Sequence, residues 1–267
     1  MPSLRLESSP LAGGRPSTIS YVRAGRGPAL LFLHGGWGYD VYPIDIDGLR
    51  SSCSVVVPSR SGYGQSTPLD SFPTDFHSRA AQETVALLDV LGIEEAVWWG
   101  HSDGAVIAAM AAIHAPSRVR GVILEALHLS AVKPRSRSFF ERMASAPDTF
   151  GPSLRATLAA EHGEDRWRHL LHLDGQAWLD LARHAPDPQT DLYDGRLVEV
   201  KSPALVVHGG QDPRTEPDEL ESILRAIPHA TLSWHVEAGH SPHSESSRDE
   251  VTTDVLDFLH TLPTPAS

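Results

Sequence analysis

The stretch Val97-Trp98-Trp99-Gly100-His101-Ser102-Asp103-Gly104 decides the fold. An apolar run ends at Gly100 and a segment of small apolar residues begins at Gly104, so the sequence predicts a buried strand, a tight turn and a buried helix. The flanking glycines permit a turn that holds the Ser102 hydroxyl out at the carboxyl end of the strand, above the helix N-terminus. A Gly-x-Ser-x-Gly pattern in this setting is typical of a nucleophilic serine.

Around this stretch, short β-rich runs alternate with segments of helical period, which is the order that builds a parallel sheet between helices. The predicted strands are Thr18–Arg23, Ala29–Leu33, Ser54–Val57, Ala96–Trp99, Val119–Leu124, Ala204–Val207 and Thr231–Val236. The predicted helices between and after them are Phe76–Leu91, Gly104–His114, one through Leu220 to Ile227 and one through Val251 to Leu259. The sequence thus predicts an α/β fold with a mostly parallel central sheet flanked by helices.

Residues 128–196 break this alternation because they contain no convincing strand. An unstructured loop of that length is improbable inside a compact domain, so we expect a helical cap insertion. Its expected helices are Phe139–Ser145, Leu154–His162 and Gln176–His184. The core is then formed by residues 1–127 and 197–267, which end in a Pro/Thr/Ser tail after Leu262.

Two residues downstream of Ser102 are candidate partners in a catalytic triad. A serine hydroxyl is a poor nucleophile at neutral pH, so it needs a neutral imidazole to accept its proton and a carboxylate to orient that imidazole. Asp212 follows the predicted strand Ala204–Val207, and His240 follows the predicted strand Thr231–Val236. Both would lie at the carboxyl edge of the sheet with Ser102, so the predicted acid is Asp212 and the predicted base is His240.

The stretch His34-Gly35-Gly36-Trp37-Gly38 predicts a loop that stabilises the oxyanion of an acyl-transfer reaction. The expected donors are the backbone N–H groups of Gly36 and Asp103. No Gly-Lys-Ser/Thr follows, which argues against a phosphate-binding loop. The candidate residues of the substrate pocket are Trp37, Glu125, His128, Phe140 and Trp178.

In these motifs the chain resembles the α/β-hydrolase superfamily, in the serine-nucleophile, esterase-like branch that includes biphenyl-hydrolase-like enzymes. The resemblance rests on His34-Gly35-Gly36, Arg60-Ser61-Gly62-Tyr63-Gly64, Gly100–Gly104, Gly209-Gly210-Gln211-Asp212-Pro213 and Gly239-His240-Ser241-Pro242, all in family order. Trp37 and Ser61 depart from the pattern, because many members have proline there. The resemblance implies the α/β-hydrolase fold. It disfavours epoxide hydrolase and haloalkane dehalogenase chemistry, because those enzymes use a carboxylate nucleophile.

The sequence therefore predicts a cofactor-independent serine hydrolase that cleaves a carboxylic ester, or a related acyl bond, of a small molecule through an acyl-enzyme. Two alternatives stay open. One is hydrolysis of a C–C bond or a lactone, which the fold does not exclude. The other is a non-catalytic ligand-binding protein that kept the scaffold.

Two carboxylates have more than one interpretation. Glu125 lies at the same edge of the sheet as the triad, and some members of the superfamily take their acid from that loop, so Glu125 is the rival to Asp212. Asp103 directly follows the nucleophile. Its carboxylate could receive a cationic substrate group such as an amine, or it could serve only as a favourable charge at the start of a helix.

The charge balance argues against two classes of partner. The 22 Lys+Arg and 34 Asp+Glu residues give a net charge of −12, which disfavours non-specific binding to nucleic acid and to anionic membranes. Arg5 and Glu7 interrupt any apolar signal core, and no run reaches the roughly 18–20 apolar residues of a membrane helix. We therefore expect a cytoplasmic protein without a membrane partner, either a monomer or a homodimer.

Cys53 is the single cysteine, so neither an intrachain disulfide nor a thiolate metal cluster is expected. Four histidines of the insertion are His162, His169, His172 and His184. Since no carboxylate or cysteine pattern converges on them, we interpret them as surface or cap residues rather than metal ligands. No cofactor is expected.

Overall fold

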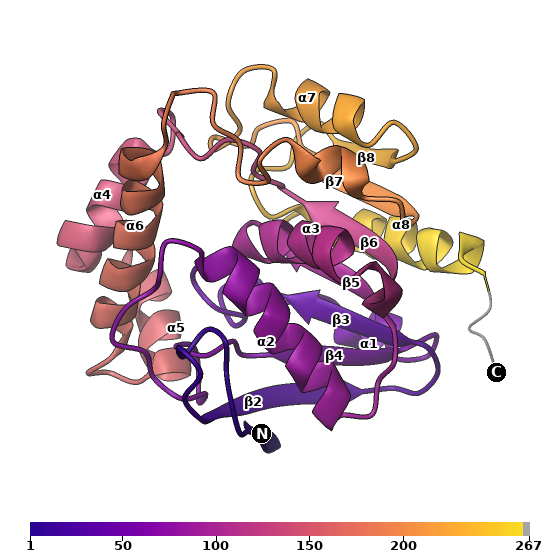
Figure 1. The fold of residues 1–267 in the computed structure, drawn as a ribbon, viewed down its shortest axis with the longest axis horizontal. Helices are drawn as coiled ribbons and strands as arrows, with labels where there is room; N and C mark the ends of the chain where they lie inside the picture. The colour runs from indigo at the N-terminus through magenta and orange to yellow at the C-terminus, as the bar shows by residue number, and fades with distance from the viewer. Residues whose placement is uncertain (264–267) are drawn as a thin grey trace.

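The computed structural model describes residues 1–263, which form one sheet in the order β1-β2-β4-β3-β5-β6-β7-β8 (Figure 1). The strands are β1 Ser3–Leu6, β2 Ser17–Ala24, β3 Ala29–Leu33, β4 Ser54–Pro58, β5 Ala96–His101, β6 Val119–Glu125, β7 Ala204–Gly209 and β8 Thr231–His235. The pairs β1/β2 and β2/β4 are antiparallel, and every pair from β4 to β8 is parallel. The mostly parallel α/β architecture is thereby confirmed.

Helices cover both faces of the sheet, because the central strands are apolar on both sides. The helices outside the insertion are α1 Ile46–Leu49, α2 Phe76–Val90, α3 Asp103–His114, α7 Glu219–Ala226 and α8 Arg248–Thr261, and short 3-10 turns lie at η1 Pro116–Arg118, η3 Arg196–Glu199 and η4 Pro242–Ser244. Helices α2, α3 and α7 pack with Leu31, Trp98 and Val206 on one face. Helices α1 and α8 pack with Leu30 and Val97 on the other.

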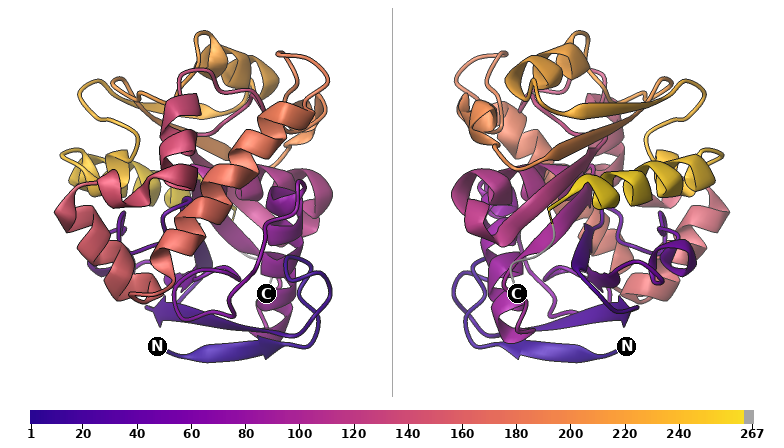
Figure 2. Two further views of the ribbon diagram at one scale, coloured as in Figure 1. Left: turned by 90° about the vertical axis from the view of Figure 1, so that its left-hand side faces the viewer. Right: turned by 90° about the vertical axis from the view of Figure 1, so that its right-hand side faces the viewer.

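Three helices lie between β6 and β7 and form a separate layer beside the sheet: α4 Arg137–Ser145, α5 Pro152–His162 and α6 Trp167–His184, with a 3-10 turn at η2 Pro147–Thr149. We call them the inserted helices. Figure 2 (left) shows them in front of the sheet. They pack in an apolar cluster with Trp37 from the loop after β3. The cluster is formed by Trp37, Phe140, Met143, Phe150, Leu158, Trp167, Leu171 and Trp178. The division into a core of residues 1–127 and 197–267 and a cap of residues 128–196 stays a prediction.

Strand β1 and helix α6 are among the elements that differ from the sequence expectations. Strand β1 was not expected: it is a four-residue edge strand in which only Leu6 is fully buried, so it carries little hydrophobic pattern. Helix α6 begins at Trp167, nine residues before the expected start at Gln176. Its first half alternates buried Leu170 and Leu171 with histidine and arginine, which hides the apolar stripe.

The Pro/Thr/Ser tail expected after Leu262 lies outside the described residues from position 264 onward. Within residues 1–263, no helix combines the length and the apolar character that crossing a membrane requires.

Candidate active site

Ser102 sits between β5 and α3 on a strained turn. Its backbone has φ 55° and ψ −119°, a conformation that non-glycine residues rarely adopt. The following helix packs so closely on the sheet that a Cβ atom at Gly104 would lie 1.9 Å from the carbonyl oxygen of Leu33. Only glycine fits there, so the pattern around Ser102 reflects a steric requirement. The backbone N–H of Ser102 donates to the carbonyl of Glu125 at 2.9 Å, which fixes the turn against β6.

Asp212 and His240 come together from the loops after β7 and β8. Nδ1 of His240 lies 3.0 and 2.9 Å from the two carboxylate oxygens of Asp212 and donates to them. The backbone N–H of Arg214 also donates to Asp212 at 2.9 Å. Both side chains are buried, and Nε2 of His240 has no hydrogen-bond partner within residues 1–263. The imidazole is therefore oriented by a carboxylate at one nitrogen and free at the other.

The protonation states suit a base of this kind. Burial lowers the pKa of His240 below its usual 6.5, and the charge of Arg214 lowers it further, so the ring is neutral near pH 7 although Asp212 opposes the shift. Burial alone would raise the pKa of Asp212. The charge and the hydrogen bond of His240, with the N–H of Arg214, more than offset burial, so that the pKa lies well below its usual range and the carboxylate stays ionised.

The hydroxyl of Ser102 points toward a second histidine. Its Oγ lies 3.3 Å from Nε2 of His128, which sits three residues beyond the end of β6. The ring of His128 in turn stacks on that of His240, with 5.6 Å between the ring centres and 17° between the planes. Two imidazoles therefore lie side by side near the serine, and the hydroxyl of Ser102 contacts the imidazole of His128.

The loop after β3 lies against the elbow, as expected for an oxyanion loop. Within residues 1–263, neither the N–H of Gly36 nor that of Asp103 donates to a protein acceptor. A Cβ atom at Gly36 would lie 2.1 Å from Oδ2 of Asp174 and 3.1 Å from Oδ2 of Asp103, so the loop is wedged between two buried carboxylates. The assignment of the backbone N–H groups of Gly36 and Asp103 as the oxyanion donors stays a prediction.

Asp103 is held by several buried side chains. Its Oδ1 accepts from Nε2 of His77 at 3.2 Å and from Nε1 of Trp178 at 2.9 Å, and Arg60 lies 4.0 Å from its Oδ2. Burial would raise the pKa of Asp103, but the hydrogen bond and charge of His77, and then Arg60, hold it below the usual value. Burial and the neighbouring Asp103 charge raise the pKa of Asp174 well above its usual value. Asp103 is thus the ionised member of the pair and Asp174 the protonated one.

Glu125 lies outside the pocket in which the sequence suggested it would be found. Its carboxylate is fully buried and accepts from the backbone N–H and Nδ1 of His243, at 3.0 and 2.8 Å, and from Nε1 of Trp99 at 3.0 Å. It makes no hydrogen bond to His240 and does not line the cavity beside Ser102. The cause is the loop after β8, which brings His243 rather than His240 over the end of β6.

The cavity beside Ser102 has a volume of about 20 Å³, room for about one water molecule. It is lined by Gly36, Trp37, Tyr42, His101, Ser102, Asp103, His128, Phe139, Phe140, Met143, Asp174, Trp178 and Arg214. Four of the five expected pocket residues, Trp37, His128, Phe140 and Trp178, therefore lie in it. Sequence reasoning missed Asp174 and Arg214. Asp174 could have been found, because it shares a helical stripe with Leu171 and Trp178.

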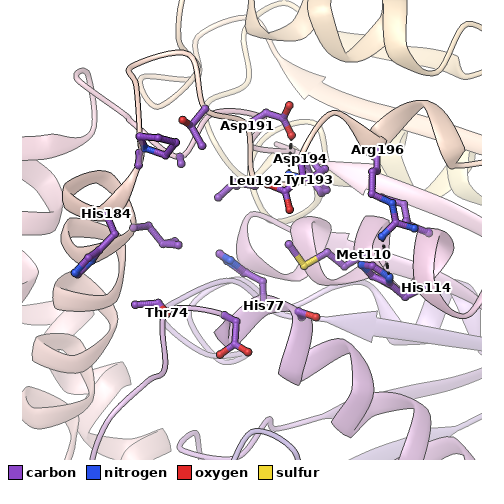
Figure 3. Close-up of a pocket in the computed structure, with 18 residues that line it drawn as sticks. Thr74, His77, Met110, His114, His184, Asp191, Leu192, Tyr193, Asp194 and Arg196 are labelled. Carbon is purple, nitrogen blue, oxygen red and sulfur yellow. Dashed lines mark hydrogen bonds between the residues drawn. The ribbon is translucent and has the colours of Figure 1, made fainter.

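A larger cavity of about 460 Å³ lies between the first turn of α2, helix α3 and the end of α6 (Figure 3). Ser102, Asp212 and His240 do not line it. Its link to the candidate site is His77, which lines this cavity (Figure 3) and donates to Asp103. Within residues 1–263, no group of three or more His, Cys, Asp or Glu side chains is arranged to hold a metal ion.

Residues 30–254 match the model of the alpha/beta hydrolase family. The chain belongs to this family. It is 28% identical over 247 residues to the serine hydrolase BPHL of Mus musculus, covering 90% of this chain and 82% of the relative. It is 27% identical over 278 residues to the 2-hydroxy-6-oxo-6-phenylhexa-2,4-dienoate hydrolase of Comamonas testosteroni, covering 90% and 91%. A thermophilic esterase from Thermogutta terrifontis has a similar fold, with a TM-score of 0.71, 22% identity, and 97% and 98% coverage.

Membership confirms the α/β-hydrolase fold and the resemblance to its esterase-like branch, and it makes the protein an enzyme of the hydrolase class. The relatives act on different bonds, so the family does not by itself identify the substrate.

Proposed function

We propose that this α/β-hydrolase is a serine esterase that cleaves small carboxylic esters through an acyl-enzyme on Ser102. The observation that carries the proposal is the paired Asp212 and His240 beside a serine held at φ 55°. A neutral imidazole with one nitrogen on a carboxylate and the other free is what a serine nucleophile requires. The five motifs that occur in family order support the same assignment.

In the proposed mechanism, Oγ of Ser102 turns from His128 to Nε2 of His240, which takes its proton as Oγ attacks the ester carbonyl. The N–H groups of Gly36 and Asp103 stabilise the oxyanion. His240 then gives its proton to the leaving alcohol, and the C–O bond to that alcohol breaks. Because the cavity has room for about one water molecule, side chains that line it must move to admit an ester.

The test is hydrolysis of p-nitrophenyl acetate, butyrate and octanoate, with product analysis by mass and detection of the acyl-enzyme on the intact protein. We expect acid and alcohol in equal amounts and an adduct on Ser102. A β-diketone-like ring-fission substrate and a lactone are assayed in parallel. If only the β-diketone is cleaved, into an acid and a carbon fragment, or only the lactone is opened, the alternative substrate class is correct. Stable binding of esters without turnover would identify a non-catalytic binding protein.

The pH dependence of kcat/KM is expected to follow His240. The base must be neutral to act, and burial and Arg214 lower its pKa, so activity should persist as the pH falls below 6.5 and reach half of its plateau only at a lower pH. In Arg214→Gln, loss of the positive charge should move this midpoint upward. Arg214→Lys keeps the charge and should move it little. A wild-type midpoint at or above pH 6.5 would contradict the expected lowering.

Asp103 is expected to favour substrates that carry an amine. Its Oδ2 is buried, and the residue lines the cavity beside Ser102. A buried ionised carboxylate is stabilised by a cation, so an α-amino ester should be hydrolysed about tenfold or more faster in kcat/KM than its N-acetylated counterpart. Asp103→Asn should abolish this preference. Asp174→Asn replaces a protonated acid by a neutral amide and should keep it. Equal rates on both esters would show that the charge serves only the helix and its neighbours.

A further inference from the structure

His128 is a buried residue whose only side-chain hydrogen bond within residues 1–263 is made to the candidate nucleophile. It is 3% exposed, and its Nε2 lies 3.3 Å from Oγ of Ser102. The ring is fixed on two sides, by stacking on His240 and by an edge contact with Trp178 at 5.2 Å between ring centres. In the acylation steps proposed for Ser102 and His240, His128 has no function of its own.

The backbone on both sides of His128 holds it in this position. Directly after β6, Ala126 adopts φ 50°, a strained conformation for a residue with a Cβ atom, and this turn leads the chain back toward Ser102. Two contacts then fix the backbone: the hydroxyl of Tyr193 donates to the carbonyl of His128 at 2.9 Å, and the N–H of Leu129 donates to Glu219 at 2.8 Å. Strain that is held in this way is typical of functional sites.

His128 differs from His240 in its partners. No carboxylate accepts from its ring within residues 1–263, and burial together with the charge of Lys133 lowers its pKa well below the usual value. The ring therefore stays neutral near pH 7 and is a poorer base than an imidazole paired with a carboxylate. What it offers the site is a hydrogen-bond acceptor at a fixed position.

We propose that His128 is a second catalytic imidazole, which holds the Ser102 hydroxyl in the free enzyme and the attacking water in the acyl-enzyme. The inference rests on the proposed esterase function. Once Oγ is esterified it has no hydrogen to donate, so Nε2 of His128 is released. The acyl carbon is then bonded to an atom that lay 3.3 Å from this nitrogen, so a water molecule that donates to Nε2 of His128 lies within reach of that carbon.

The deacylation step follows from this position. One O–H of the water donates to Nε2 of His128, and the other gives its proton to Nε2 of His240 as the water oxygen bonds to the acyl carbon. The bond from that carbon to Oγ of Ser102 then breaks, and Oγ takes the proton from His240. His128 neither gains nor loses a proton. Its contribution is to fix the water in line with the acyl carbon.

The experiment measures acylation and deacylation separately in wild type, His128→Leu and His128→Gln. Leucine keeps an apolar side chain against Trp178, and the glutamine amide can place an acceptor near the position of Nε2. Acylation is measured by stopped flow with enzyme in excess over p-nitrophenyl butyrate. Deacylation is measured as decay of the acyl-enzyme by intact mass. We expect His128→Leu to slow deacylation by about 10- to 100-fold while acylation changes less than about threefold, and His128→Gln to restore much of the loss.

A matched control is His235→Ala, which removes another buried imidazole whose hydrogen bonds go to Ser233 and Glu250. It should change neither rate. If His128→Leu slows both steps equally, or neither, the proposal is overturned. Should that variant not fold, His128→Ala takes its place and is judged by the same ratio of rates. If wild type forms no Ser102 adduct and Ser102→Ala keeps full activity, it is the esterase function itself that fails.

Discussion

Ser102→Ala should lower kcat/KM for p-nitrophenyl butyrate by at least about 10⁴-fold, because it removes the Oγ atom that forms the covalent bond to the acyl group in the proposed mechanism. The loss should fall on turnover rather than on folding, since alanine keeps the Cβ atom and removes only Oγ. Intact-mass measurement should find the acyl adduct in wild type and not in the variant. Retained turnover would remove Ser102 from the mechanism.

Ser102→Gly gives a second readout of the same residue. The backbone at φ 55° is strained for serine and unstrained for glycine, so the variant should be inactive yet more stable by about 1 kcal/mol. Against this gain stands the greater backbone entropy of glycine in the unfolded chain, which reduces it. Ser233→Ala removes a buried hydroxyl that bonds His235 and should retain turnover. Inactivity joined to a raised melting temperature in Ser102→Gly is the signature of a strained catalytic turn.

The central architecture was predictable because it follows from short-range patterns. All seven expected strands are present, and Ser102, Asp212 and His240 could be named as candidates because each follows a strand that ends at the same edge of a parallel sheet. The spacing of Gly100 and Gly104 also has a local cause, since a Cβ atom at Gly100 would lie 2.0 Å from the carbonyl oxygen of Gly104.

What escaped prediction depends on how the inserted helices pack on the sheet. Asp174 lies beside Gly36 of the oxyanion loop because of where α6 packs, and sequence spacing alone does not fix that packing. The same is true of Arg214, whose guanidinium lies 3.9 Å from the ring centre of Phe139 on α4. The direction of the Ser102 hydroxyl toward His128 is a matter of one side-chain rotation, which no sequence pattern encodes.

Asp212→Asn and Glu125→Gln should separate the two candidate acids by their effects on rate and on stability. An asparagine at 212 can donate to the imidazole, which favours the tautomer with its proton on Nε2 and leaves no base for Ser102. We therefore expect kcat to fall by about 10⁴-fold. Thermal unfolding should change little by comparison, because the amide still fills the space between His240 and the N–H of Arg214.

Glu125→Gln should show the opposite pattern. The carboxylate accepts three hydrogen bonds, from two groups of His243 and from Trp99, and a glutamine amide presents one acceptor and one donor group in their place. At least one buried donor then loses its acceptor, which should lower the free energy of unfolding by about 1–3 kcal/mol. Because Glu125 makes no hydrogen bond to His240, kcat should stay within about tenfold of wild type. A loss of several orders of magnitude in kcat from Glu125→Gln, with Asp212→Asn active, would exchange the two assignments.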